Sequence, residues 1–428
     1  MFSGINNTIK RDNYRWVIWA VCALAFLIVF FHRYALGVVA EDLGSELHLS
    51  GTQLGNLISM YFYIYAILQI PAGILADTIG PRAITVSGMI IAGIGSFILG
   101  SSTIPVTAYL GRFLVGLGVS GILICILKIQ TLWFKPKEFA TVLGLTSLVG
   151  NSGGILATTP FSLLVMNIGW RSSFYVIGII SILIAGLLWL VVRDKPEDLN
   201  YSSVLEHTDE NNNIDIKSGL LYIIKDKSTW VNFIILAGIM GTIMSFSGGW
   251  GVTYLMHVYD MSNDAAATQV LIFTIGVLIG SPIMGRVADL FGDRKRLIQV
   301  GSLVFTVVWG YKVIAMNNIL PMYQLPIVYF LAGFFGIFMM LTHAIIKEIN
   351  PPKFSGVAIS VINIAPFVGT VILNFVIGWV LDLTWQGEFV NGARLYEPEN
   401  YQYAFLSYFI VSLIAFIFSF YINETKRS

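Results

Sequence analysis

The sequence has very few charged residues for its length. Of its 428 residues, 25 are Lys or Arg and 24 are Asp or Glu, which is 11% of the chain. A typical soluble protein carries about 25% charged residues, so this composition excludes a soluble enzyme, a disordered chain and a coiled coil. The net charge of +1 excludes a nucleic-acid-binding protein, because it provides no electrostatic footprint for phosphates. The remaining class is a protein whose main solvent is lipid.

Cysteines and enzymatic motifs are equally scarce. The two cysteines, Cys22 and Cys125, lie in apolar runs and predict neither a disulfide framework nor a metal site. The sequence contains no Walker loop, no H-E-x-x-H motif and no nucleophile elbow. We therefore expect a protein that is not an enzyme, with no catalytic residues, no metal and no other cofactor.

Long apolar runs are what the sequence does contain. A membrane-spanning helix needs about 20 mostly apolar residues, and the mean hydropathy of +0.78 is high. The runs do not alternate between polar and apolar residues, which excludes the strands of a membrane barrel. We predict twelve membrane-spanning helices, at approximately 15–40, 54–76, 83–101, 106–134, 139–167, 173–192, 229–257, 266–284, 297–316, 325–346, 355–381 and 403–422.

The positive charges predict how the chain crosses the membrane. If the N-terminus is placed inside, most Lys and Arg residues fall in the inner segments, and only Arg171 and Arg394 lie clearly in outer ones. Inner loops carry such an excess of positive charge. We therefore expect a multi-pass membrane protein with both termini in the cytoplasm. The low charge suits the bacterial inner membrane, and an organelle membrane is the alternative.

One inner connection is longer and more polar than the others. Residues 193–228 separate six predicted helices from six more, and they contain Asn-Asn-Asn at their centre. We interpret this segment as a cytoplasmic linker, in part flexible and in part an amphipathic helix. The predicted domains are a six-helix bundle at 1–192, the linker at 193–228 and a second six-helix bundle at 229–428.

A short loop motif occurs twice, once in each half. Residues 73–82 and 285–294 share Gly, Ala, Asp, Gly and Arg at the same positions, and half of the chain separates the two copies. Glycine permits a tight turn between the helices, and the Asp and Arg could pair with each other or with a helix end. The alternative is a positively flanked turn without further function. The predicted gating residues in these loops are Gly73, Asp77, Gly80, Arg82, Gly285, Asp289, Gly292 and Arg294.

This repeated motif resembles the signature loop of the major facilitator superfamily. A second motif, Arg112-Phe-Leu-Val-Gly116-Leu-Gly118, is similar to a pattern that the family has in its fourth helix. The resemblance implies an all-α membrane protein with twelve helices in two pseudo-symmetric six-helix bundles. It also implies a substrate held near the midplane, alternating access to the two sides, and a gating or structural role for Arg112. We expect a monomer in the lipid bilayer.

Two cations inside predicted helices are candidates for substrate binding. An ionisable residue within the bilayer is costly and often functional. Arg33 lies in the segment FFHRYALGVV, and as a planar fork it could bind a carboxylate or phosphate. Lys128 could add a second positive charge. The alternatives are that Arg33 extends to the headgroups or pairs with Glu41 or Asp42, and that Lys128 extends inward or pairs with Glu138. Lys312 is expected to extend to the membrane surface.

Carboxylates are absent from the middle of the predicted helices. We therefore expect a positive cavity without an obvious proton carrier, although His32 and His343 could titrate. Transport of the solute could be coupled either to protons or to a counter-anion.

Other polar and aromatic residues could contact a solute. Tyr61, Tyr65 and Gln69 share one face of the second helix, and the glycines before Trp250 and Tyr254 could let the seventh helix bend. The alternative for each is helix packing or an interfacial aromatic belt. The predicted substrate-binding residues are Arg33, Lys128, Tyr61, Tyr65, Trp250, Tyr254, His343 and Asn363.

These observations predict a secondary active transporter. The expected solute is small and anionic or zwitterionic: a carboxylate, an amino acid or a short peptide. The first alternative is a sugar-phosphate or organophosphate exchanger, against which the lack of a cation in the seventh helix counts. The resemblance extends to bacterial permeases for organic anions and sugar phosphates, because the FHRY segment is similar to their first helices. The alternative from another class is a membrane sensor or receptor derived from a transporter.

Overall fold

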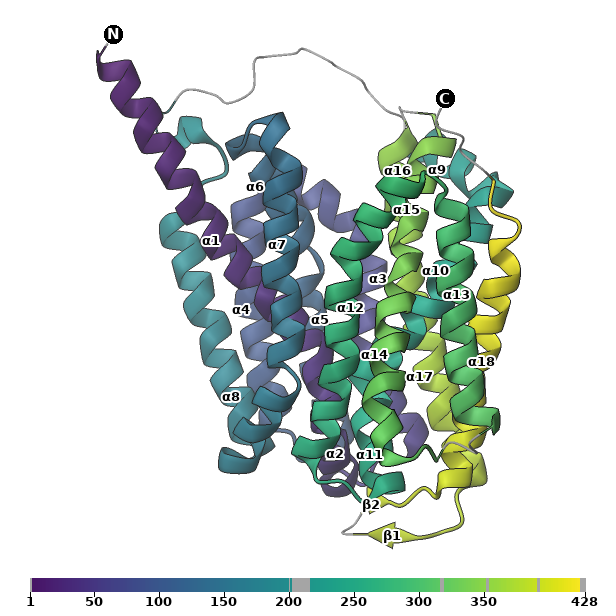
Figure 1. Ribbon diagram of the computed structural model, residues 1–428. Helices are drawn as coiled ribbons and strands as arrows, with labels where there is room; N and C mark the ends of the chain where they lie inside the picture. Colours follow the sequence, from purple (N-terminus) through teal and green to yellow (C-terminus); the bar gives the residue numbers. More distant parts are fainter. Residues whose placement is uncertain are drawn as a thin grey trace. The chain divides into compact units, whose positions relative to one another are not determined.

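The computed structural model describes residues 2–199, 201, 216–315, 319–351, 354–390 and 393–423. Nearly all of its elements are helices (Figure 1). The helices of the first half are α1 (Phe2–Val38), α2 (Ala40–Glu46), α3 (Gly51–Thr78), α4 (Pro81–Gly100), α5 (Pro105–Ser120), α6 (Ile122–Trp133), α7 (Pro136–Leu156), α8 (Thr159–Val191) and η1 (Pro196–Leu199).

The second half continues in the same way and ends in one long helix. Its elements are α9 (Ile216–Lys225), α10 (Lys227–Ser245), η2 (Phe246–Trp250), α11 (Gly251–Tyr259), α12 (Asn263–Phe291), α13 (Arg294–Gly310), η3 (Tyr311–Ala315), η4 (Met322–Gln324), α14 (Leu325–Gly336), η5 (Ile337–Met340), α15 (Leu341–Ile349), α16 (Ser355–Asn363), α17 (Ala365–Thr384), β1 (Phe389–Val390), β2 (Ala393–Arg394) and α18 (Pro398–Ser419).

The predicted fold class is confirmed. Ten helical segments within the described residues are long and apolar enough to cross a membrane. Two further helices, α3 and α7, complete the twelve predicted spans. Lipid offers no hydrogen-bond partners to the backbone, so apolar runs of this length satisfy their own amides as helices.

Two predicted irregularities lie where the sequence places them. The seventh span changes from α10 to the π-helical η2 at Phe246–Trp250, within the glycine-rich stretch, and continues as α11. The eleventh span breaks between α16 and α17, with Pro366 in the first turn of α17. Proline is tolerated in a first turn because its missing N–H would have no partner there.

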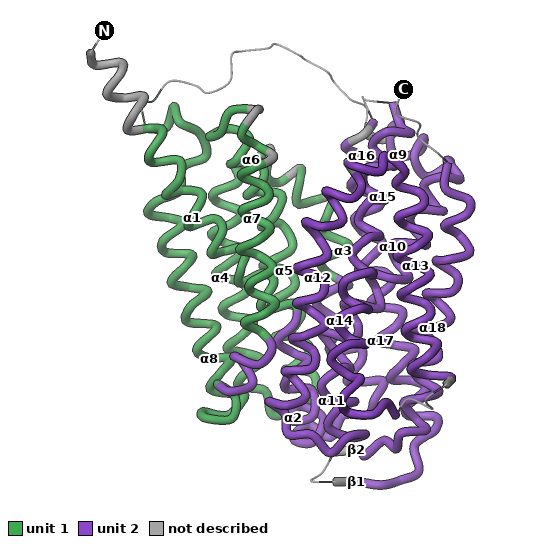
Figure 2. The backbone as a smooth tube through the Cα atoms, in the orientation of Figure 1, with its two compact units in different colours: residues 1–33, 64–157, 164–212 green, residues 34–63, 158–163, 213–428 purple. Residues whose placement is uncertain are grey.

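The first of two compact units comprises residues 1–33, 64–157 and 164–212 (Figure 2). Within this unit α4 packs against α5 at very short range. A Cβ added to Gly88 would lie 2.3 Å from the carbonyl oxygen of Gly118, so the two backbones touch where neither residue has a side chain. Small residues allow this close approach of membrane helices.

The second unit comprises residues 34–63, 158–163 and 213–428 (Figure 2). Its interior is rich in aromatic side chains from α11, α13, α14 and α18, most of them fully buried. The strands β1 and β2 form an antiparallel pair, with Phe389 opposite Arg394. Each compact unit combines segments that are separated in the sequence, because the units are defined by spatial packing. The predicted domain boundaries at residues 192 and 229 stay a prediction. Part of the predicted linker, at 200 and 202–215, lies outside the described residues, and its final part forms α9.

Both copies of the repeated loop turn on a glycine in the left-handed region. Gly80 has φ +102° and Gly292 has φ +68°, which confirms the predicted need for glycine at these positions. A Cβ on Gly73 or Gly285 would meet nothing within 4 Å, so neither is required for close packing. The side chains of Asp77 and Asp289 lie outside the described residues.

Candidate functional site

Arg33 lies near the end of α1 and is buried within the first unit, with 5% of its surface exposed. The guanidinium carbon is 4.5 Å from the centroid of the Phe30 ring and 5.4 Å from that of the Tyr65 ring. The structure therefore brings together two predicted binding residues, Arg33 and Tyr65. The two aromatic faces attract the guanidinium, which stays charged inside a protein.

Arg112 supports the segment of α1 that carries Arg33. It is 1% exposed, and its Nη1 donates a hydrogen bond of 2.7 Å to the carbonyl oxygen of His32. His32 is itself fully buried, with Nε2 3.4 Å from the hydroxyl of Ser181. The arginine of α5 thus fixes the backbone directly before Arg33, and His32 packs against α8.

Lys128 contacts the end of α3. Its Nζ donates a hydrogen bond of 3.0 Å to the carbonyl oxygen of Ala76, the residue before Asp77. Glu138, the partner considered for Lys128, forms an ion pair of 2.7 Å with Arg15. A positive charge at a helix C-terminus is favourable because the last carbonyl groups carry partial negative charge. This contact associates Lys128 with the predicted gating loop.

The arginines of the two loops attach to other helix ends. The backbone N–H of Arg82 donates to Asp194, at 2.7 Å, and its guanidinium lies 4.2 Å from the Trp189 ring of α8. In the second copy, Arg294 forms an ion pair with Glu348 of α15. Each loop is therefore tied to a neighbouring helix through its arginine.

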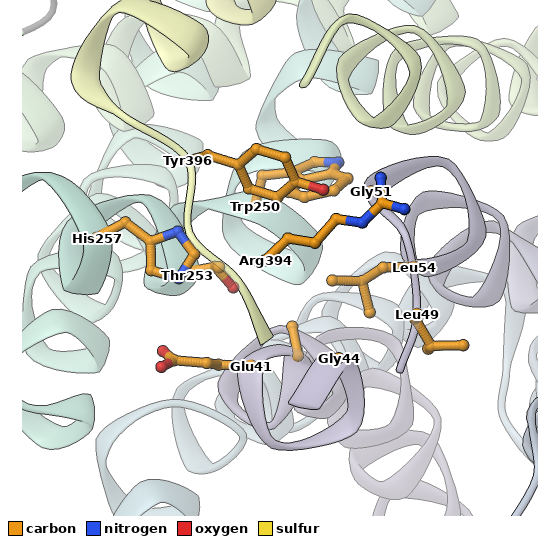
Figure 3. Close-up of a pocket in the computed structure, with 11 residues that line it drawn as sticks. Glu41, Gly44, Leu49, Gly51, Leu54, Trp250, Thr253, His257, Arg394 and Tyr396 are labelled. Carbon is orange, nitrogen blue, oxygen red and sulfur yellow. The ribbon is translucent and has the colours of Figure 1, made fainter. Parts of the chain in front are cut away.

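A pocket in the second unit is lined by the predicted residue Trp250 and by polar side chains from α2, α11, β2 and the segment before α18 (Figure 3). The indole Nε1 of Trp250, the hydroxyl of Thr253 and one carboxylate oxygen of Glu41 are buried without a hydrogen-bond partner among the described residues. Burial, and then the neighbouring Asp42, raise the pKa of the Glu41 carboxyl. The lining residues are Ala40, Glu41, Gly44, Leu49, Gly51, Leu54, Trp250, Thr253, His257, Arg394 and Tyr396.

Asp382 organises one wall of this pocket. Its carboxylate accepts hydrogen bonds from the backbone N–H groups of Gly51, at 2.7 Å, and Thr52, at 2.8 Å. Arg394 and the hydroxyl of Tyr396 also donate to it, each at 3.0 Å. In Figure 3 the guanidinium of Arg394 lies on the Gly51 side of the pocket, whereas Glu41 extends from α2. Asp382 thus caps the first turn of α3 and joins it to α17.

The remaining predicted binding residues lie in three other places. Tyr61 is fully buried, with its ring 5.1 Å from that of Phe62. The ring Nδ1 of His343 lies 3.3 Å from the carbonyl oxygen of Met340, and the side chain of Asn363 lies nearby. Tyr254 is also fully buried, but it faces Lys312 instead of the pocket.

The expectation that Lys312 reaches the membrane surface is wrong. Lys312 is 1% exposed, and its ammonium lies among aromatic rings inside the second unit. The attraction of a cation to these ring faces replaces the headgroup contact that was expected. The only signal in the sequence is the density of aromatic residues in the last span, where Tyr401, Phe405 and Tyr408 share one helical face. Asp382 was missed because its partners at Gly51 and Thr52 are distant in the sequence.

Comparisons with known proteins agree with this architecture. The model of the family described as Major Facilitator Superfamily matches residues 22–271 and 249–428. The chain is 25% identical to a probable hexose phosphate transport protein of Chlamydia trachomatis, over 86% of this chain and 85% of the relative. It is 23% identical to the probable galactarate/D-glucarate transporter GudP of Bacillus subtilis, over 96% and 94%.

Two further likenesses concern a sensor and a solved structure. The membrane sensor protein UhpC of Escherichia coli is 22% identical to this chain, over 86% of each sequence. The crystal structure of a bacterial homologue of the human lysosomal transporter Spinster has a TM-score of 0.81 at 18% identity. That comparison covers 96% of this chain and 97% of the other, and it shows the twelve-helix fold.

Proposed function

Since this chain belongs to the major facilitator superfamily, as a transporter of organic anions or sugar phosphates, we propose that it moves a sugar acid across the membrane by alternating access. The observation that carries this proposal is the buried guanidinium of Arg33, with its two aromatic neighbours. A bidentate pair between a guanidinium and a carboxylate provides both affinity and orientation.

The choice of a carboxylate over a phosphate rests on the distribution of cations. D-glucarate and a sugar phosphate both carry about two negative charges, but the phosphate concentrates them on one group and would favour a second cation beside the first. Lys128 donates to the end of α3, and the seventh span contains no Lys or Arg after Lys227. Among the relatives, the one named as a galactarate/D-glucarate transporter covers 96% of this chain, which supports the same class of solute. Hexose phosphate is the alternative within transport.

Uptake into proteoliposomes tests the proposal. We expect the wild-type protein to take up D-glucarate or D-glucuronate in preference to glucose 6-phosphate. Arg33→Ala should reduce this uptake by about 100-fold, because loss of one member of a buried charge pair costs about 2–5 kcal/mol. Arg171→Ala is the matched control, since Arg171 also lies over an aromatic ring, that of Trp170 at 4.2 Å. Equal loss in both variants, or preferred uptake of glucose 6-phosphate, would contradict the sugar-acid assignment.

A sensor is the candidate from another class, and the likeness to UhpC favours keeping it. A sensor would bind the anion without accumulating it. Thermal stabilisation by D-glucarate in detergent reports binding, because a ligand that binds the folded form shifts the unfolding equilibrium. Stabilisation by D-glucarate combined with no uptake in liposomes would favour the sensor over the transporter.

We further propose the gating roles of the two loops and the orientation with both termini in the cytoplasm. The orientation is supported by the excess of positive charge in the predicted inner segments. Cys22 and Cys125 are both buried, so they provide a low background for thiol labelling. A cysteine introduced at Glu399 should react with an impermeant maleimide from outside intact bacteria, and one at Asn423 should not. The reverse pattern would invert the predicted topology.

A further inference from the structure

Lys312 lies in a cage of aromatic side chains inside the second unit. Its Nζ is 3.9 Å from the ring centroid of Tyr254, 4.6 Å from that of Phe405 and 4.9 Å from that of Trp309. The rings of Phe246, at 5.3 Å, and Tyr329, at 5.6 Å, complete the cage. The side chain is 1% exposed, and Nζ has no hydrogen-bond partner among the described residues.

A buried amine in this position is subject to two opposing effects on its proton. Burying an ammonium group without a counter-ion is costly, and such a group tends to lose its proton. The five ring faces act in the opposite direction, because each attracts the charged form. The cage therefore holds a group for which both the ammonium and the neutral amine are accessible. A guanidinium in the same place would stay charged.

The ionisable groups that face Lys312 do not include a carboxylate among the described residues. Tyr254 of α11 and Tyr329 of α14 belong to the cage, and Tyr401 and Tyr408 of α18 pack behind it. Phe246 of η2 and Trp309 of α13 do not titrate. His257 is one step further away, with Nδ1 3.0 Å from the hydroxyl of Tyr401. The charge of Lys312 is thus balanced by ring faces instead of an anion.

The cage joins the two π-helical segments of the second unit. Lys312 belongs to η3 (Tyr311–Ala315), and Phe246 is the first residue of η2 (Phe246–Trp250). Such π-helical turns are rare and occur frequently at functional sites. A change in the charge of Lys312 would alter its attraction to Phe246, in η2, and to Tyr254, in the following α11. Trp250 and Thr253 in this same region line the pocket.

A line of hydroxyl groups leads from the cage toward the end of the seventh span. Tyr254, over whose ring the ammonium lies, donates a hydrogen bond of 3.5 Å to the hydroxyl of Tyr259. Tyr259 is half-buried and accepts a hydrogen bond of 2.6 Å from the backbone N–H of Leu320, next to an exposed residue, Ile319. These two hydroxyls lie between the cage and the exposed end of the span, and no hydrogen bond of Nζ joins Lys312 to them among the described residues.

We propose that Lys312 is the proton-binding site of this transporter, and that its protonation state sets the packing of η2 and α11 during the transport cycle. The caged ammonium releases its proton to water, and the neutral amine takes one up from water again. The inference rests on the proposed transport function, for which it supplies a coupling proton. It also provides the titratable group that the sequence did not supply as a carboxylate inside a helix.

Two opposite substitutions test this role. Lys312→Met keeps the length of the side chain but is always neutral, and Lys312→Arg is always charged. Lys347→Met is the control, because Lys347 is exposed at the end of α15. With D-glucarate in proteoliposomes, an inward gradient of about two pH units should drive about a 100-fold accumulation by the wild type, because each unit is a factor of ten in proton activity.

Both Lys312 variants should lose this accumulation and retain exchange of labelled for unlabelled D-glucarate without a gradient. If Lys312 had only a structural role, the result would differ. The side chain of Met in Lys312→Met would fill the cage and leave proton-driven accumulation intact. Accumulation at the wild-type level by either Lys312→Met or Lys312→Arg, or wild-type uptake that ignores the pH gradient, would overturn the proposal. If one variant does not fold, the other still decides.

A readout without substrate separates this inference from the proposed function. The indole of Trp309 contacts the ammonium, so protonation of Lys312 should change tryptophan emission. We expect the wild-type protein to show a pH-dependent change that is absent from Lys312→Met and from Trp309→Phe, and present in Lys347→Met. A wild type that titrates but takes up no anion would contradict the transport proposal alone. A wild type with the same emission profile as Lys312→Met would contradict the proton site alone.

Discussion

Arg33 and Lys312 are both buried cations in membrane-spanning segments, and both lie against aromatic rings, but their surroundings differ. Arg33 contacts the rings of Phe30 and Tyr65, and its neighbour His32 is held by Arg112. Lys312 is enclosed by five rings from several helices. The first is a guanidinium whose backbone is positioned by Arg112, and the second is an ammonium enclosed by rings.

The difference follows from the chemistry of the two side chains. A guanidinium stays protonated, so it suits a site that must attract an anion at every stage of a cycle. A lysine amine can lose its proton when it is buried, so it suits a site whose charge must change. This difference is why we propose substrate recognition at Arg33 in the first unit and proton binding at Lys312 in the second.

The largest expected effect comes from exchanging the two types of cation. Arg33→Lys should weaken D-glucarate binding by about 10- to 100-fold, because a point charge cannot form the bidentate pair, which is worth about 1.5–3 kcal/mol per charged hydrogen bond. Lys312→Arg should leave this affinity within about threefold, an effect below about 1 kcal/mol. Titration calorimetry in detergent measures both. Loss of binding in Lys312→Arg would mean that the two cations share one role.

The rings around the two cations should differ in their contribution to stability. Phe405→Leu removes one wall of a fully enclosed cage, and we expect a loss of about 2–3 kcal/mol from the cavity and the missing cation–π contact. Phe30→Leu, beside the more open Arg33, should cost about 1 kcal/mol or less. Thermal unfolding of both variants in the same detergent gives the comparison. Equal losses would show that the two environments are alike.

Much of the fold could be predicted from the sequence, because lipid leaves few choices. An apolar run long enough to span the membrane must form a helix, so the twelve spans follow from composition and length. The turns at Gly80 and Gly292 and the break before Pro366 follow from the backbone properties of single residues. These features depend on local chemistry that a short segment already contains.

The environment of each site could not be predicted in the same way. Lys312 was expected at the surface, because the rings that hold it come from helices distant in the sequence. Asp382 binds backbone groups of Gly51 and Thr52, which are more than three hundred positions away. The direction of a long side chain at a helix end depends on such partners, and helical periodicity carries no information about them.

A third cation, Lys128, sharpens the comparison because its ammonium is held by a backbone carbonyl group. Its hydrogen bond to the carbonyl oxygen of Ala76 holds the end of α3 next to the repeated loop. We expect Lys128→Met to slow D-glucarate exchange by about fivefold with unchanged affinity, since a half-buried hydrogen bond contributes about 1 kcal/mol. Lys347→Met should leave both quantities unchanged. A weaker affinity for D-glucarate in Lys128→Met would place Lys128 in the binding site instead.

The smallest effect concerns a carboxylate outside the membrane spans, where titration depends on burial and not on rings. Burial, and then the nearby Glu46, raise the pKa of Asp42 from 3.8 to about 6. The folded protein therefore binds this proton more tightly than the unfolded chain, so the resulting stabilisation is complete below about pH 4 and is lost as the pH rises through about 6.

Asp42→Asn should consequently flatten the fall in melting temperature between about pH 4 and pH 6, because the asparagine has no charge to bury. Glu46→Gln should flatten it less, since burial is the larger cause of the raised pKa. Melting curves in detergent at a series of pH values measure both. A wild-type melting temperature that rises over this interval and is unaffected by Asp42→Asn would contradict the raised pKa. It would mean that Asp42 is ionised in the folded state. A carboxylate next to Glu41 would then keep its charge without nearby aromatic rings or cations.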